Sequence, residues 1–190
     1  MKQQSSFITL GLAAVTSLAT IILPASFNQS TAAESQPNKV TFLCQSMFDP
    51  ASGDKIPTTV AWIPERKGHV RFIGWKSEYF NKSGWTPIER CKKVSQKFQE
   101  FYEQGRLNYL ASGQVKGQPV ICGFANQGET CNSSNQLFTL KKQANSEEVI
   151  QKLMDISEGK SSEQLFQSSG KQLSISVKTF LNKSTLIQTK

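Results

Sequence analysis

Histidine is nearly absent from this chain of 190 residues, and the single one, His69, excludes any site that needs two imidazoles. The glycine loops GxGxxG and GxxxxGK[ST] are missing, so neither common phosphate-binding loop is present. No cysteines stand in CxxC pairs, and no acidic cluster has the spacing of a calcium loop. We therefore predict no metal site and no cofactor.

Acidic residues are in short supply, with 14 Asp and Glu against 22 Lys and Arg, which gives a net charge of +8. Hydrophobic residues make up 37% of the chain, enough for a core. This composition excludes collagen-like chains and multi-span membrane proteins, and it disfavours wholesale disorder. The length predicts one domain and a targeting segment before it.

Long apolar runs are also rare, and the one that stands out is 7–23, between Lys2 and Pro24. With the small residues of Thr31-Ala32-Ala33 after it, this run predicts a secretory signal peptide over residues 1–33. Cleavage after Ala25 is the second choice. An uncleaved anchor is the alternative, because the run is near the lower length limit for a bilayer span. We expect a periplasmic or extracellular protein, which disfavours nucleic acid as a partner.

The four cysteines predict two disulfides, because an even count in an exported chain is typical of an oxidised framework. Cys122 and Cys131 bracket a Gly- and Asn-rich turn between two strand-like runs, so we pair them. Cys44 then pairs with Cys91 by elimination. The competing interpretations are a zinc site and a nucleophilic thiol with His69 as its base.

Hydrophobic patterning predicts an α+β fold: one antiparallel sheet of about six strands with two packed helices. After a polar leader (34–39), the domain covers 40–182, with a mobile loop at 157–170 and a polar tail at 183–190. The strand-like runs are 40–44, 58–63, 69–75, 107–110, 118–122, 137–140 and 173–177.

The clearest helix begins at Thr86-Pro87-Ile88-Glu89, a capping box with proline at the first helical position. Gly105 ends it. Its predicted buried stripe consists of Ile88, Cys91, Val94, Phe98, Phe101 and Tyr102. This stripe lets Cys91 tie the helix to the strand that carries Cys44. A second helix begins at Asn145.

Several segments resemble the circadian oscillating protein family of photosynthetic bacteria. They are Pro57-Thr58-Thr59, 73–80, 84–99, 113–122 and 137–141, and the resemblance covers most of 41–177. The cysteine spacing, the Thr-Pro helix start and the Phe-Thr-Leu strand recur in order. The resemblance implies a secreted or membrane-peripheral protein with no established biochemical activity; the family name implies expression under a circadian clock.

Catalysis has little support in the sequence. A Ser/His/Asp triad would depend on His69, which stands at the start of a strand beside a basic turn. A small secreted hydrolase using clustered carboxylates is the alternative function, with Asp49, Asp54, Glu78 and Glu89 as candidates. No spacing selects two of them, and Glu89 already has a capping role. We therefore expect a non-catalytic envelope or membrane-surface protein.

Cationic residues gather between the first hairpin and the capped helix. If they share a face, they would attract an anionic lipid surface, an acidic polysaccharide or an acidic protein. A solvated basic surface is the plainer interpretation. The predicted anion-binding face consists of Arg66, Lys67, Lys76, Lys82, Lys92, Lys93 and Lys97.

Four aromatic residues, Trp75, Tyr79, Phe80 and Trp85, stand between strand and helix. They would stack on sugar rings or a pigment, or pack in the core, and we favour the core. Arg90 would anchor an anion or bridge to Glu89 or a backbone carbonyl, and we favour the structural role.

Overall fold

The computed structural model describes residues 37–158 and 172–187. The predicted signal peptide (1–33) therefore lies outside the described residues, as do 34–36 of the leader, 159–170 of the predicted loop and 188–190 of the tail.

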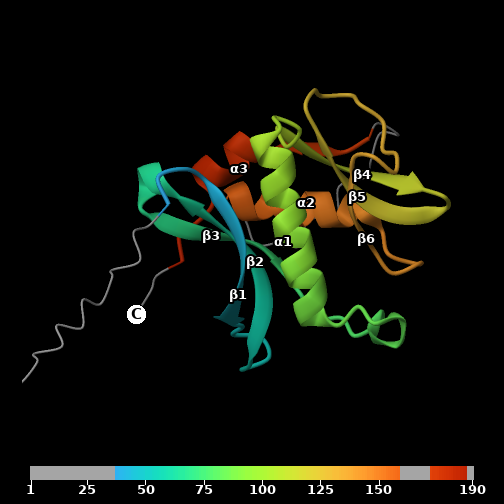
Figure 1. The fold of residues 1–190 in the computed structure, drawn as a ribbon, viewed down its shortest axis with the longest axis horizontal. Coiled ribbons are helices and arrows are strands. Elements are labelled where there is room, and N and C mark those ends of the chain that lie inside the picture. Colours follow the sequence, from blue (N-terminus) through green and yellow to red (C-terminus); the bar gives the residue numbers. More distant parts are fainter. Residues whose placement is uncertain (1–36, 159–171, 188–190) are drawn as a thin grey trace, which may run out of the picture. The chain divides into compact units, whose positions relative to one another are not determined.

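Two antiparallel sheets form the domain, not one sheet of about six strands (Figure 1). Sheet A has the order β1-β2-β3, with β1 at Thr41–Phe48, β2 at Lys55–Ile63 and β3 at Gly68–Gly74. Its connections are short hairpins, so neighbours in sequence are neighbours in the sheet.

Sheet B has four strands in the order β6-β5-β4-β7. They are β4 at Tyr109–Val115, β5 at Gln118–Phe124, β6 at Gln136–Thr139 and β7 at Ser174–Ser176. The predicted single sheet was wrong, because β4 pairs with β5 and β7 and with no strand of sheet A. Local patterning predicts strands but does not say which distant strands pair.

The described residues contain three α-helices: α1 at Pro87–Glu103, α2 at Ser146–Glu158 and α3 at Val177–Lys183. Two helices were predicted, and the missed one is α3. The alternation of 173–177 suggested a strand through Val177, but Ser176 ends that strand. Its hydroxyl accepts a hydrogen bond from Thr179 N, which caps α3.

One hydrophobic core joins both sheets and the helices. α1 packs against β1 and β2, whereas α2 packs against β4 and α3 (Figure 1). Phe72 is central to this core, because its ring lies 4.2 Å from that of Phe180 and 5.7 Å from that of Phe98. A smaller cluster, which includes Val120 and Phe124, also packs on sheet B.

Both predicted disulfides are confirmed. Cys44–Cys91 joins β1 to α1, and Cys122–Cys131 joins β5 to the segment before β6. Gly113 lies against the second disulfide, where a side-chain Cβ would collide with Cys131. The first crosslink therefore holds α1 to sheet A, and the second closes the loop between β5 and β6.

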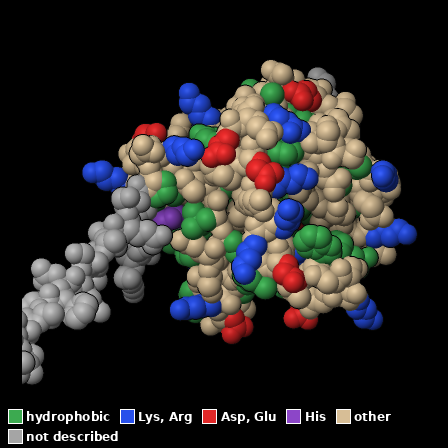
Figure 2. Space-filling model, viewed as in Figure 1, with side chains coloured by type: hydrophobic (Ala, Val, Ile, Leu, Met, Phe, Trp, Pro, Cys, Tyr) green, Lys and Arg blue, Asp and Glu red, His purple; other side chains and the backbone are tan. Residues whose placement is uncertain are grey.

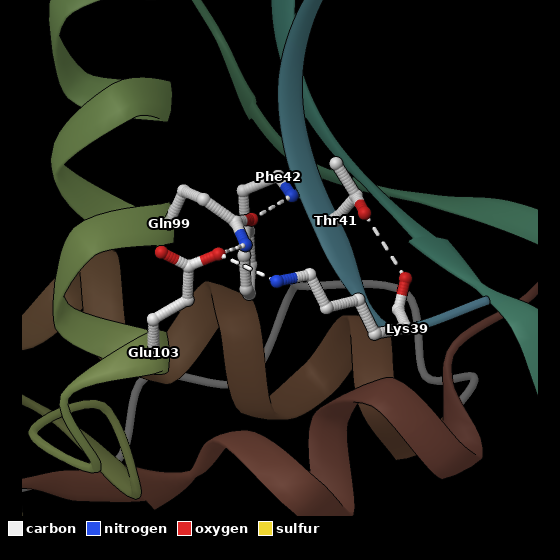
Figure 3. A network of polar contacts seen from close by, with 5 residues as sticks. All are labelled: Lys39, Thr41, Phe42, Gln99 and Glu103. Carbon is white, nitrogen blue, oxygen red and sulfur yellow. Dashed lines mark hydrogen bonds and ion pairs between the residues drawn. The ribbon is translucent and has the colours of Figure 1, made fainter. Parts of the chain in front are cut away.

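A polar network also docks the C-terminal half of α1 on β1 (Figure 3). Gln99 Oε1 accepts the backbone N–H of Phe42 at 2.7 Å, and Gln99 Nε2 donates to Glu103 at 2.9 Å. Lys39 Nζ lies 3.1 Å from the same carboxylate. Because β1 is an edge strand, Gln99 pairs an edge N–H group, which limits pairing there with another chain.

Candidate anion-binding site

Helix α1 positions the candidate site. The predicted capping box is confirmed: Thr86 Oγ1 accepts from Glu89 N, and Glu89 Oε2 accepts from Thr86 N. Cys91, Val94, Phe98 and Phe101 are buried as predicted, and Ser95 is buried with them. Ile88 and Tyr102 were expected in this stripe, but they are 44% and 36% exposed.

Arg90 is held between two aromatic rings. Its Cζ atom lies 4.7 Å from the centroid of Trp75 and 4.7 Å from that of Phe80. Nη1 donates to the carbonyl of Ser77 at 3.2 Å, so the expected bridge to a backbone carbonyl is confirmed. Burial lowers the pKa of the guanidinium from its ordinary value. Within the described residues it has no carboxylate partner.

Two lysines continue along the same side of α1. Lys93 and Lys97 follow Arg90 at intervals of three and four residues, which places all three on one flank of the helix. Lys97 Nζ lies 5.7 Å from the centroid of Phe101, and Arg106 Cζ lies 4.2 Å from that centroid. We call Arg90, Lys93, Lys97 and Arg106 the cation row.

Three members of the cation row interact electrostatically, because Lys93 and Arg106 both act on Lys97. Burial is the main cause that lowers the pKa of Lys97, and repulsion from Lys93 and Arg106 lowers it further against the opposing effect of Glu100. In residues 37–158 and 172–187, none of the four makes an ion pair with a carboxylate. Such a row favours an anion that approaches this flank.

Exposed apolar side chains lie beside the row. Figure 2 shows Lys and Arg side chains over α1 and a hydrophobic patch beside its N-terminal half, toward β6. A groove of about 530 Å³ opens there. Phe80 and Trp85 form one wall, Arg90 and Lys93 a second, and Gln136 and Phe138 of β6 a third.

The other predicted basic residues lie elsewhere or are already paired. Arg66 and Lys67 are at one end of β3, where Arg66 donates to the carbonyls of Leu181 and Ser184 at 2.6 and 2.8 Å. Lys76, just past the other end of β3, forms an ion pair with Asp49. Of the predicted face, α1 brings only Lys93 and Lys97 to one flank.

Lys92 and Lys82 are the two remaining residues of the predicted set. Lys92 lies near Glu89 and contributes to that carboxyl's lowered pKa, which the hydrogen bonds from Thr86 chiefly cause. Lys82 is exposed in the 3-10 turn at Asn81–Ser83.

Sequence reasoning missed Arg106 and the exposure of two aromatic residues. Trp75 is buried, as expected for a core residue, and its indole N–H donates to Thr59 Oγ1 at 3.0 Å. Trp85 and Tyr79, however, are 46% and 58% exposed. Phe101 and Arg106 are five residues apart, and no local spacing predicts that the Arg106 guanidinium lies over the Phe101 ring.

Two candidate hydrolytic carboxylates have structural partners. Lys76 and Ser52 hydrogen-bond to Asp49 and lower its carboxyl pKa to about 2. Glu89 has its capping role, and the hydrogen bonds from Thr86 lower its pKa. A general acid in glycoside hydrolysis needs a raised pKa, so these two groups lack that property.

His69 is part of the sheet surface. It is opposite Trp62 in the β2–β3 register, with the two ring centroids 5.1 Å apart. Burial lowers its pKa from the ordinary value. In the described part of the chain, no three His, Cys, Asp or Glu side chains come together as metal ligands.

A family model described as circadian oscillating protein COP23 matches residues 41–182, which is most of the chain and covers both sheets. The chain belongs to this family. The match confirms the resemblance carried by the cysteine spacing and the capped helix. No curated protein and no solved structure matches the chain. None of the helices in residues 37–158 and 172–187 has the length and apolar character needed to cross a membrane.

Proposed function

We propose that this member of the COP23 family is an exported, non-catalytic protein that binds an anionic partner through the cation row of α1. The supporting observation is that Arg90, Lys93 and Lys97 follow one flank of α1, that Arg106 lies close enough to Lys97 to lower its pKa, and that none of the four makes an ion pair among the described residues. Three of these cations, Arg90, Lys97 and Arg106, also lie over aromatic rings, which limits the entropy lost on binding.

Export is supported by the cysteines. All four form disulfides in the structure, and disulfides persist in oxidising compartments. The apolar run after Lys2 is consistent with this route. An exported chain with this charge meets anionic lipid, acidic polysaccharide and acidic protein, all of which remain candidate partners.

Charge reversal on α1 tests the proposal. The purified chain with both disulfides intact is applied to an anionic resin and to vesicles containing anionic lipid, and is eluted with salt. We expect Lys93→Glu/Lys97→Glu to elute at much lower salt than the wild type, because surface attraction is screened over about 8–10 Å at working salt.

The matched control is Lys142→Glu/Lys178→Glu. It makes the same change in net charge at two exposed lysines outside α1. If both double variants elute at the same salt concentration, net charge alone governs binding and the cation row has no special role.

A further inference from the structure

We infer that the groove between α1 and β6 binds an acidic polysaccharide chain, with a sugar carboxylate on Arg90 and Lys93 and a sugar ring against Trp85. This inference rests on the proposed function, because it identifies the partner of the same cationic flank. It differs from that proposal in placing the contact inside the groove.

Arg90 supplies the first argument. The two rings that hold the guanidinium also shield it from water, and Ser77 takes only one of its five N–H donors among the described contacts. A cation that is partly removed from water and lacks a counter-charge is unfavourable by itself. A carboxylate entering the groove would pair with a guanidinium that is already oriented, and a planar fork suits that geometry.

The aromatic wall supplies the second argument. Trp85 is 46% exposed and lines the groove together with Phe80 and Phe138. A contiguous exposed apolar patch is typical of an interaction surface. The apolar face of a pyranose ring is flat and of similar size to an indole, so stacking would bury both.

The third wall has the polar groups that sugar hydroxyls need. Gln118 and Gln136 both line the groove, and Gln136 Nε2 donates to Thr139 Oγ1 at 2.8 Å. That bond fixes the amide and leaves its carbonyl oxygen available as an acceptor. Ring, cation and amide thus occur together, and each unit of a uronic acid chain presents their counterparts: an apolar face, a carboxylate and hydroxyls.

A lipid surface fits these features less well. Anionic headgroups reach protruding lysines, whereas Arg90 is recessed between Trp75 and Phe80. The acidic side chains of a peptide would satisfy the cations, but Asp and Glu have no ring to stack on Trp85. We therefore commit to the carbohydrate, and the peptide and the membrane become outcomes of the test.

The test is calorimetric titration of the disulfide-intact chain with three hexamers: oligogalacturonate, its fully methyl-esterified form and hexaglutamate. Vesicles containing anionic lipid are tested in parallel. We expect oligogalacturonate to bind best, and Trp85→Ala and Arg90→Gln to weaken it by roughly tenfold each. Phe48→Ala is the matched control, because Phe48 of β1 is a more exposed aromatic outside the groove lining. Circular dichroism verifies that each variant is folded.

The outcomes separate the two proposals. Equal binding of hexaglutamate and oligogalacturonate, both unaffected by Trp85→Ala, would overturn the carbohydrate inference and leave the cation row intact. Equal binding of the esterified hexamer would also overturn it, because the carboxylate would then be irrelevant. Binding to vesicles alone would assign the row to membranes. If the wild type binds none of the hexamers or vesicles, and Lys93→Glu/Lys97→Glu elutes from the resin at the wild-type salt concentration, both the carbohydrate inference and the proposed function are overturned.

Discussion

Asp49 and Lys76 illustrate how single residues set the local electrostatics of this domain. Asp49 follows β1 and Lys76 follows β3, so their ion pair joins two segments that are distant in sequence. Asp49 Oδ2 also accepts from Ser52 N at 3.0 Å and from Ser52 Oγ at 2.6 Å. The hydrogen bond from Lys76 is the largest cause of the lowered pKa of Asp49.

The first prediction concerns acid stability. The carboxyl pKa of Asp49 is about 2 in the folded chain against an ordinary value of 3.8. The Asp49 carboxylate therefore stabilises the fold fully at pH values above its ordinary pKa. This stabilisation is lost as the pH falls through the pKa of the folded chain. Asp49→Asn should flatten the pH dependence of the free energy of unfolding between about pH 4 and pH 2. Urea unfolding at several pH values measures this.

An NMR titration provides the control. Lys76→Met should raise the pKa of the Asp49 carboxyl toward its ordinary value, whereas Lys82→Met should leave it unchanged, because Lys82 does not contact Asp49. An Asp49 carboxyl that titrates at its ordinary value in the wild type would contradict the ion pair.

At the scale of elements, a buried polar cluster joins α1 to sheet A. Thr59 of β2 is fully buried, and its Oγ1 accepts from Trp75 Nε1 and from Ser95 Oγ, each at 3.0 Å. A buried polar group is stable only when it is paired. The cluster therefore fixes the position of α1 and of the loop that holds Arg90.

The second prediction is that Thr59→Val destabilises the domain by roughly 2–4 kcal/mol, because it leaves two buried donors without an acceptor. Ser95→Ala removes one donor and should cost about 1 kcal/mol. Guanidinium unfolding of the two variants gives the comparison. Equal costs for the two substitutions would show that Thr59 does not serve both donors.

The accuracy of sequence reasoning also differs between elements. Thr86, Pro87 and Glu89 predicted the start of α1, because capping is decided within one turn. α3 was missed although Ser176 is a suitable cap with Val177, Phe180 and Leu181 at helical spacing, since the alternation before it suggested a strand. The division into two sheets depends on pairings between distant segments, such as Leu110 with Ile175, which no local pattern contains.

The candidate site was predictable only in part, for the same reason. Lys93 and Lys97 on one helix flank follow from spacing. The position of Arg90 between Trp75 and Phe80 depends on how the loop before α1 folds back. The exposure of Trp85 also depends on that loop, whereas the sequence analysis favoured a place for Trp85 in the core.

At the scale of the whole molecule, the two disulfides hold together a small domain whose core is shared by two sheets. Cys44–Cys91 spans 47 residues, and Cys122–Cys131 spans 9. A crosslink over a longer separation restricts the unfolded chain more. The first disulfide therefore bears more on global stability.

The third prediction follows from these separations. Cys44→Ala/Cys91→Ala should lower the free energy of unfolding by about 4 kcal/mol and Cys122→Ala/Cys131→Ala by about 3 kcal/mol. Denaturant unfolding gives both values. The prediction is wrong if the second pair of substitutions destabilises the domain more than the first.

The proposed binding site depends on the whole fold, because α1, the loop before it and β6 must be in their native arrangement. Amide chemical-shift mapping tests it most directly, with the ¹⁵N-labelled chain titrated with oligogalacturonate. We predict that the shifts concentrate at Trp85, along the Arg90–Lys97 flank and at β6. Shifts confined to sheet A, or spread over all exposed lysines, would contradict the account.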